Sequence, residues 1–169
     1  MLKIPILTVI GRSGTGKTTF LVKMIRELTL RGLRLATIKH HSHSGFEIDQ
    51  TGKDSWLHAQ AGSRHVIIAA PDKIASYRLL ENELTLDEIA ADVADVDLIL
   101  VEGYKQAGKP SIEIVRKKMG TTTLIGDLQQ TIAILTDTPL EVSVPQFDLD
   151  DIPEVADLIQ TWMVSATGG

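Results

Sequence analysis

Short apolar runs and segments of helical periodicity alternate from the start of the chain. Residues 4–10 form a nearly continuous apolar run, which is typical of a strand buried on both faces of a parallel sheet. A glycine-rich turn follows, and apolar residues then recur at helical spacing from Phe20 to Leu28, with Gly32 placed to stop the helix. Residues 33–39 read as a second strand. The pattern therefore predicts a strand–helix–strand unit with a right-handed crossover.

The alternation continues through the rest of the chain. We expect a short helix opened by a capping box at Thr51 and another helix opened at Thr85. The other expected elements are strands at 66–70, 75–80, 97–102, 112–116 and 131–135, a closing helix at 152–162 and a frayed tail at 165–169. This order predicts an α/β fold, a three-layer αβα sandwich whose mostly parallel sheet has an antiparallel portion near 75–80 or 112–116. The length suits a single domain, 1–169.

Charge and composition exclude several classes of partner. The chain has 17 Lys and Arg against 22 Asp and Glu, a net charge of -5, and 4% aromatic residues. This charge has the wrong sign for a surface that neutralises a run of phosphates, and few rings are present for base stacking, so nucleic acid is not an expected partner. Without cysteine the chain forms neither a disulfide nor a thiolate metal site. No apolar run reaches the roughly 18 residues of a membrane span, so we expect a cytoplasmic protein without a membrane partner.

Residues 11–18, Gly-Arg-Ser-Gly-Thr-Gly-Lys-Thr, match the phosphate-loop pattern G-x-x-x-x-G-K-[ST] at every fixed position. The glycines let several backbone N–H groups converge on one phosphate, and the following helix turns its positive end toward the same point. We expect Lys17 to reach the β and γ phosphates and to act in catalysis, and the Thr18 hydroxyl to bind Mg²⁺. The expected nucleotide-binding residues are Gly11, Arg12, Ser13, Gly14, Thr15, Gly16, Lys17, Thr18 and Thr19.

Arg12 adds a second cation inside this loop. It either contacts a phosphate of its own subunit, crosses a dimer interface as an arginine finger, or points into solvent. Of these alternatives, the solvent-facing one is the simplest.

An acidic residue is expected at the carboxyl end of a buried strand next to such a loop. Glu102 follows the apolar run 98–101 and is a candidate catalytic and metal-binding residue, which holds Mg²⁺ through water or orients the attacking water. The alternative is that Glu102 only caps a strand end at the surface. Asp97 lies at the other end of the same strand, about 16 Å away at ordinary strand rise, and is assigned a structural role.

A histidine-rich loop follows the second strand and contains His40, His41 and His43. Three histidines so close together suggest a Zn²⁺ site, although one loop without cysteine rarely provides a closed tetrahedron. The alternatives are a solvated polar loop and a mobile switch and substrate loop over the triphosphate, which we favour. In that interpretation Lys39, Lys53 and the imidazoles contact an anionic ligand. Asp49 is then a third candidate ligand for Mg²⁺.

Taken together, these segments resemble the MobB family, the accessory proteins of molybdopterin guanine dinucleotide synthesis. The resemblance rests on the phosphate loop, Ile38-Lys-His40 with its histidine-rich continuation, Gly52-Lys-Asp-Ser55, Asp97 to Lys105, and Thr136-Asp-Thr-Pro139. The resemblance implies that the protein binds GTP with Mg²⁺, hydrolyses GTP feebly and forms a homodimer. It also implies assistance to the guanylyltransferase MobA, which joins a GMP moiety to molybdopterin. Molybdopterin is therefore a further candidate ligand. The sequence departs from the family at Ser44-Gly45, where an Asp is expected, and Asp49 is the matching acid.

The choice of base and of reaction stays open at this point. Guanine is usually recognised by a carboxylate in an Asn-Lys-x-Asp run, which this chain lacks; Asp137, after the strand at 131–135, either replaces it or starts the turn ending at Pro139. A metabolic kinase is the alternative function, but it needs a lid rich in arginine, and the seven arginines are scattered. A third alternative is an interaction domain that keeps a nucleotide site as scaffolding. As an enzyme, the protein is at most a weak GTPase.

Overall fold

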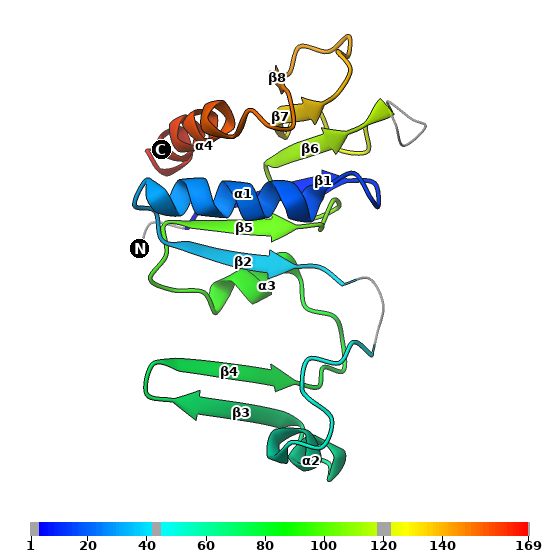
Figure 1. The fold of residues 1–169 in the computed structure, drawn as a ribbon, viewed down its shortest axis with the longest axis vertical. Helices are drawn as coiled ribbons and strands as arrows, with labels where there is room; N and C mark the ends of the chain where they lie inside the picture. The colour runs from blue at the N-terminus through cyan, green and yellow to red at the C-terminus, as the bar shows by residue number, and fades with distance from the viewer. Residues whose placement is uncertain (1–3, 42–44, 118–122, 169) are drawn as a thin grey trace. The chain divides into compact units, whose positions relative to one another are not determined.

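The protein was analysed as a computed structural model, which describes residues 4–41, 45–117 and 123–168 (Figure 1). The chain forms two compact units. The first contains the chain up to His40 and again from Thr85 onward, and the second contains His41–Leu84. The expectation of one domain stays a prediction.

A six-stranded sheet forms the centre of the first unit, and all of its strand pairs are parallel. In spatial order the strands are β2 (Leu35–Lys39), β5 (Leu98–Glu102), β1 (Ile6–Gly11), β6 (Ser111–Val115), β7 (Thr131–Thr136) and β8 (Gln146–Phe147). The predicted strands are confirmed, except that the segment near 112–116 pairs in parallel, and the two-residue β8 was not predicted. Because β1 lies between β5 and β6, the loop that follows β1 leaves the sheet near its middle.

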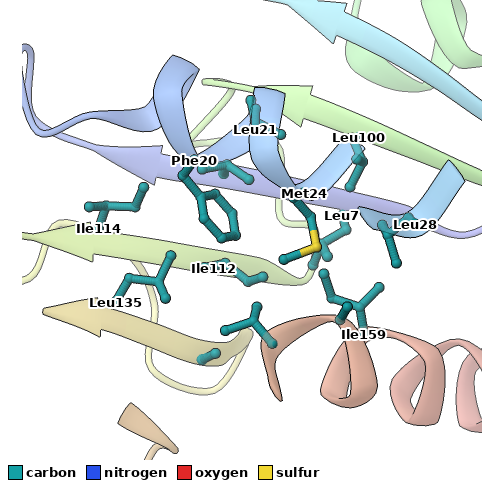
Figure 2. Packing of buried hydrophobic residues seen from close by; sticks show 14 of the residues in the cluster. Leu7, Phe20, Leu21, Met24, Leu28, Leu100, Ile112, Ile114, Leu135 and Ile159 are labelled. Carbon is teal, nitrogen blue, oxygen red and sulfur yellow. The ribbon is translucent and has the colours of Figure 1, made fainter. Parts of the chain in front are cut away.

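Helices cover both faces of this sheet, as the α/β prediction required. Helices α1 (Lys17–Leu30) and α4 (Ile152–Thr167) share one hydrophobic core with one face, as Figure 2 shows for Phe20, Met24 and Ile159. Helix α3 (Leu86–Ala91) packs Leu86 with strand residues of the opposite face. Alternate residues of each strand enter the two cores, which accounts for the continuous apolar runs in the sequence. The fully buried members of the first core include Leu7, Val9, Met24, Leu28, Leu98, Leu100, Ile112, Ile114, Leu135 and Ile159.

The C-terminal helix is longer than the sequence indicated. The prediction of a frayed tail from residue 165 is wrong, because α4 continues to Thr167. The hydroxyls of Ser165 and Thr167 donate to the carbonyls of Thr161 and Met163, one helical turn earlier. These bonds satisfy polar groups at the helix end, so the last turn forms although it lacks strong apolar periodicity.

Two similar capping patterns have different outcomes. At Thr85 both bonds of a capping box form with Glu88, at the start of α3. The capping box expected at Thr51 is wrong, since α2 (Asp54–Gln60) begins after Lys53 without a side-chain cap. Gly52 has φ +85° and the Lys53 N–H donates to the Gln50 carbonyl, so residues 50–53 form a turn that separates Thr51 from the helix.

Asp97 has the structural role that was expected. Its carboxylate accepts bonds from the backbone N–H and the guanidinium of Arg34, at 2.8 Å, 3.1 Å and 2.7 Å. Arg34 directly precedes β2 and Asp97 directly precedes β5. The pair therefore joins the starts of two neighbouring parallel strands.

The second unit contains α2 and a separate two-stranded sheet. Strands β3 (His65–Ala70) and β4 (Lys73–Arg78) pair antiparallel, with Val66 opposite Tyr77. The antiparallel portion predicted near 75–80 is thus confirmed, in a sheet of its own rather than at an edge of the main sheet. Within the residues that the structure describes, no helix is long and apolar enough to cross a membrane.

Candidate functional site

The phosphate loop, Gly11–Thr18, connects the central strand β1 to the first turn of α1. Its three glycines all have positive φ, +148° at Gly11, +77° at Gly14 and +98° at Gly16. A Cβ on Gly11 would lie 2.6 Å from the carbonyl oxygen of Ile114 in β6, so a larger residue does not fit there. The glycine at position 11 therefore has a steric cause, the close approach of β1 and β6, and Gly14 and Gly16 provide the positive φ that the loop requires.

The N-terminal end of α1 is suited to an anion. Gly16 is the N-cap and provides no side-chain hydrogen bond, and the first turn contains no acidic residue. The first N–H groups of a helix have no partner within the helix and carry a partial positive charge. A phosphate group accepts hydrogen bonds from these N–H groups and balances the positive charge, which agrees with the phosphate site predicted from the sequence.

Lys17 folds back over the loop. Its Nζ donates to the carbonyls of Gly11, at 3.0 Å, and Arg12, at 2.9 Å. Burial lowers the pKa of the Lys17 ammonium below its usual value; the Glu102 charge opposes this shift and the Lys39 charge adds to it. Carbonyl groups carry no net charge, so these two hydrogen bonds do not neutralise the Lys17 ammonium. Its positive charge can therefore attract a phosphate held in the same loop.

Thr18 and Glu102 lie in direct contact although 84 positions separate them. The Thr18 hydroxyl is 3.0 Å from both carboxylate oxygens of Glu102, and the Lys39 Nζ is 3.6 Å from Oε1. The Glu102 side chain is 15% exposed, which does not fit a simple surface cap of a strand. The contact arises because β5 lies between β1 and β2, so their carboxyl ends meet at one edge.

This pair of groups fits Mg²⁺. A hydroxyl and a carboxylate provide the hard oxygen ligands that the ion prefers, beside a loop shaped for phosphates. The third candidate ligand, Asp49, belongs to the second unit, where it accepts hydrogen bonds from the Tyr77 hydroxyl at 3.0 Å and the Gln50 N–H at 2.8 Å. A hydrogen bond from Ser55 is the main cause that lowers the pKa of Asp49. Asp49 is therefore ionised, and its role as a metal ligand stays a prediction.

The histidine cluster is divided between the two units. His40 belongs to the first: its N–H donates to the Glu102 carbonyl at 2.9 Å, and its ring centre is 4.4 Å from that of Tyr104. A Cβ on Gly103 would lie 3.0 Å from the His40 Cβ, so His40 is packed against the segment after β5. Tyr104, with φ +53°, is a neighbour that the sequence did not reveal.

The other two histidines, His41 and His43, are not found beside the phosphate loop in the described part of the first unit. His41 is exposed in the second unit, where its ring centre is 5.5 Å from that of Phe46, and Lys53 is exposed as well. His43 lies outside the described residues. In the described part of the chain, no three His, Asp or Glu side chains are grouped so that they could hold a metal ion.

Asp137 lies where the ends of β6 and β7 meet. Its Oδ1 accepts a hydrogen bond of 2.8 Å from the Lys117 N–H, which is the main cause that lowers the pKa of Asp137. The neighbouring Thr136 and Thr138 form a turn through the Thr136 hydroxyl, so the turn expected here is present. The other oxygen of the carboxylate, Oδ2, is 3.9 Å from Nε of Arg116. Arg116 was not predicted from the sequence, where its signal is a basic residue directly after the apolar run 112–115.

Arg12 is exposed, as the solvent-facing alternative required. Together with Gly11, Ser13, Lys105 and Ile125 it lines an open hollow of about 630 Å³ beside the phosphate loop. Both Arg12 and Lys105 lack an ion-pair partner among the described residues. Both cations therefore remain available to a ligand.

Comparison with known proteins gives one consistent result. The sequence profile of the family described as "Molybdopterin guanine dinucleotide synthesis protein B", MobB, matches residues 6–137. The chain is 40% identical over 163 residues to the molybdopterin-guanine dinucleotide biosynthesis adapter protein of Haemophilus influenzae. The aligned region covers 95% of this chain and 90% of that protein. It is 37% identical over 171 residues to the protein of the same description from Escherichia coli, covering 98% and 97%.

The fold agrees with this result. A crystal structure of molybdopterin-guanine biosynthesis protein B superimposes with a TM-score of 0.72 at 30% identity, and the match covers 93% of this chain and 99% of that one. The sequence match includes the phosphate loop, Lys39, Glu102 and Asp137. The chain therefore belongs to the MobB family, whose members named here are adapter proteins of molybdopterin-guanine dinucleotide biosynthesis.

Proposed function

We propose that this protein binds Mg²⁺ and GTP through residues 11–19, hydrolyses GTP slowly, and assists a MobA-type guanylyltransferase that attaches a GMP moiety to molybdopterin. The observation that carries the proposal is the contact of Thr18 with Glu102 at the uncapped end of α1. It combines a phosphate cradle with two oxygen ligands suited to Mg²⁺. Family membership supports the biosynthetic role.

The residues of the loop divide the work of binding. Backbone N–H groups and Lys17 hold the β and γ phosphates, and Thr18 and Glu102 hold the metal. When bound, Mg²⁺ neutralises the charge that develops on the phosphate oxygens. Because Glu102 is already engaged by Thr18 and Lys39, its carboxylate is not free to activate water, and we expect slow hydrolysis.

Asp137 is proposed as the residue that recognises guanine. Its pKa is lowered, so the carboxylate is ionised at neutral pH and accepts hydrogen bonds from the base N1–H and the exocyclic amine. It lies beyond β7, two strands from β1, at the same sheet edge as the phosphate loop. Replacement by Asn would change an acceptor into a mixed donor and acceptor, and would shift preference from guanine toward xanthine.

We also propose that the protein is a homodimer. The paired strands β3 and β4 expose Ile67, Ile68 and Ile74, whose exposed fractions are 55%, 49% and 71%. By the strand register, Ile67 and Ile74 lie on one face of this sheet and Ile68 on the other. Exposed isoleucines on so small a sheet are typical of a surface that another chain covers. Light scattering tests this: Ile74→Asp should convert the protein to a monomer, Thr29→Asp on the exposed side of α1 should not, and a monomeric wild type would refute it.

The main experiment is calorimetric titration with GTP and with ATP in the presence of Mg²⁺. We expect GTP to bind more tightly, with phosphate release that stays slow until the partner enzyme is added. Equal affinity for ATP would remove the guanine assignment. Rapid transfer of phosphate to a small acceptor would favour the kinase, and absence of nucleotide binding would refute the proposal.

A further inference from the structure

Arg116 follows β6 directly and reaches the phosphate loop. Its Nη1 is 3.8 Å from the point that a Cβ on Gly16 would occupy, so the guanidinium lies beside the N-terminal end of α1. A cavity of about 10 Å³, lined by Arg12, Thr15, Glu113 and Arg116 among others, lies between the loop and β6. That volume holds about one water molecule, so the guanidinium is packed closely against the loop.

One polar atom of this side chain lacks a partner. Nε of Arg116 is buried and makes no hydrogen bond to any described residue. Asp137 Oδ2, at 3.9 Å, attracts the charge but is too distant for a hydrogen bond. Buried donors in folded proteins are nearly always bonded, so the unbonded Nε of a side chain that is 34% exposed as a whole shows that the described residues leave the guanidinium incompletely satisfied.

The charges around Arg116 also favour a bound anion. The N-terminal end of α1 is positive, and neither a cap nor an acidic residue in the first turn offsets it. A guanidinium next to this end is repelled by it. An anion placed between them removes the repulsion and accepts hydrogen bonds from both, whereas Asp137 engages only the far side of the guanidinium.

We propose that Arg116 is a nucleotide-binding residue that donates hydrogen bonds to the phosphate nearest the ribose. The argument rests on the proposed function: with the outer phosphates in the loop and the base at Asp137, the innermost phosphate lies between them. Arg116 lies between Gly16 and Asp137 and is near both. Its flat guanidinium matches the oxygens of a phosphate group, which a lysine matches less well.

Binding of GDP and GTP to three variants tests this. Arg116→Ala should weaken both nucleotides by about tenfold to a hundredfold, as expected for the loss of charged hydrogen bonds. Arg116→Lys, which keeps the charge without the fork, should recover part of the loss. Arg26→Ala removes an exposed arginine of α1 and should bind within twofold of wild type. Thermal melting checks that each variant folds, and the Lys variant serves if the Ala variant does not.

Inorganic tripolyphosphate distinguishes a direct contact from an effect through Asp137. This probe has no base, so Asp137 does not recognise it. A direct phosphate contact predicts that Arg116→Ala weakens tripolyphosphate as well, while Asp137→Ala does not. Loss confined to guanine nucleotides would show that Arg116 only positions Asp137 and would overturn the proposal.

Failure of this inference is distinguishable from failure of the proposed function. If wild type binds neither GTP nor GDP, the nucleotide-binding function itself is refuted. If wild type binds both and Arg116→Ala binds equally well, the function stands and the role of Arg116 is refuted.

Discussion

The two units of this protein differ sharply in how much they bury. The first unit encloses Leu7, Val9 and Met24 completely between its sheet and helices. In the second unit, Val66 is the one buried residue among those described, and Ile74 is 71% exposed. The second unit is held by polar contacts instead, such as those of Tyr77 with Asp49 and the Ser55 carbonyl.

The difference in buried surface suits the two units to different proposed functions, ligand binding in the first and assembly in the second. A phosphate loop requires fixed backbone N–H groups, and only a densely packed sheet and helix can hold them within fractions of an ångström. A unit with so little buried surface contributes little stability of its own, which is a reason to expect that another chain covers its isoleucines. The proposed nucleotide site therefore lies in the well-packed first unit, and the surface proposed for assembly lies in the second.

The largest expected effect comes from cutting a side chain out of the first core. Met24→Ala should lower the free energy of unfolding by about 2–5 kcal/mol, because it leaves a cavity between α1 and the sheet. The matched change in the second unit, Ile74→Ala, should lower it by less than about 0.5 kcal/mol in a monomeric background. Chemical denaturation measures both. Equal losses would contradict the contrast between the units.

Lys17→Ala should weaken GTP binding by about a hundredfold, because the phosphates lose the cation bound within their own loop. The effect belongs to the first unit alone, since the substitution removes no core contact and should leave the melting temperature nearly unchanged. Lys23→Ala, which removes an exposed ion pair with Asp150, is the control. Affinity within twofold of wild type would defeat the assignment of the loop.

Glu102→Gln should leave GTP affinity nearly intact, because the phosphate loop is unchanged, and should slow hydrolysis by at least about tenfold, because a neutral amide holds Mg²⁺ less well than a carboxylate. The amide keeps an oxygen for the Thr18 hydroxyl, so the geometry survives while the negative charge is lost. A single-turnover phosphate assay at several Mg²⁺ concentrations measures it. An unchanged rate would remove Glu102 from the mechanism.

The smallest effect concerns acid stability. Hydrogen bonds from Arg34 lower the pKa of Asp97 from 3.8 to about 2. A carboxyl whose pKa is depressed by folding stabilises the protein above its unfolded pKa and loses that contribution as pH falls through the folded value. Asp97→Asn should therefore be less stable than wild type at neutral pH, and the difference should shrink between pH 3.8 and 2.

Much of the fold could be predicted, because helices and buried strands leave local periodic signals. The strands ending at Lys39 and Glu102 were located within two residues of their observed bounds, and α1 contains the whole helical pattern from Phe20 to Leu28. Predictions were wrong where the backbone conformation of an adjacent residue determined where a helix begins. Thr51 and Thr85 carry comparable patterns, yet the left-handed backbone at Gly52 places Thr51 outside its helix.

The site could be predicted only in part for a related reason. The glycine, lysine and threonine of the phosphate loop follow one another in the chain, so their spacing alone indicates phosphate chemistry. Arg116 carried no comparable signal, because its closeness to Gly16 depends on β6 lying next to β1.

The amino-acid sequence by itself determined the phosphate loop, the identity of Glu102 as its acidic neighbour and the alternation of strands and helices. The phosphate loop and the alternation depend on residues a few positions apart, whose geometry the backbone limits directly, and Glu102 was identified because it directly follows the apolar run 98–101. Only the tertiary structure decided that the hairpin of β3 and β4 forms its own sheet, that His40 packs on Tyr104 while His41 belongs to the other unit, and that Arg116 reaches α1. Such contacts follow from strand order and register, which hydrophobic periodicity leaves undetermined.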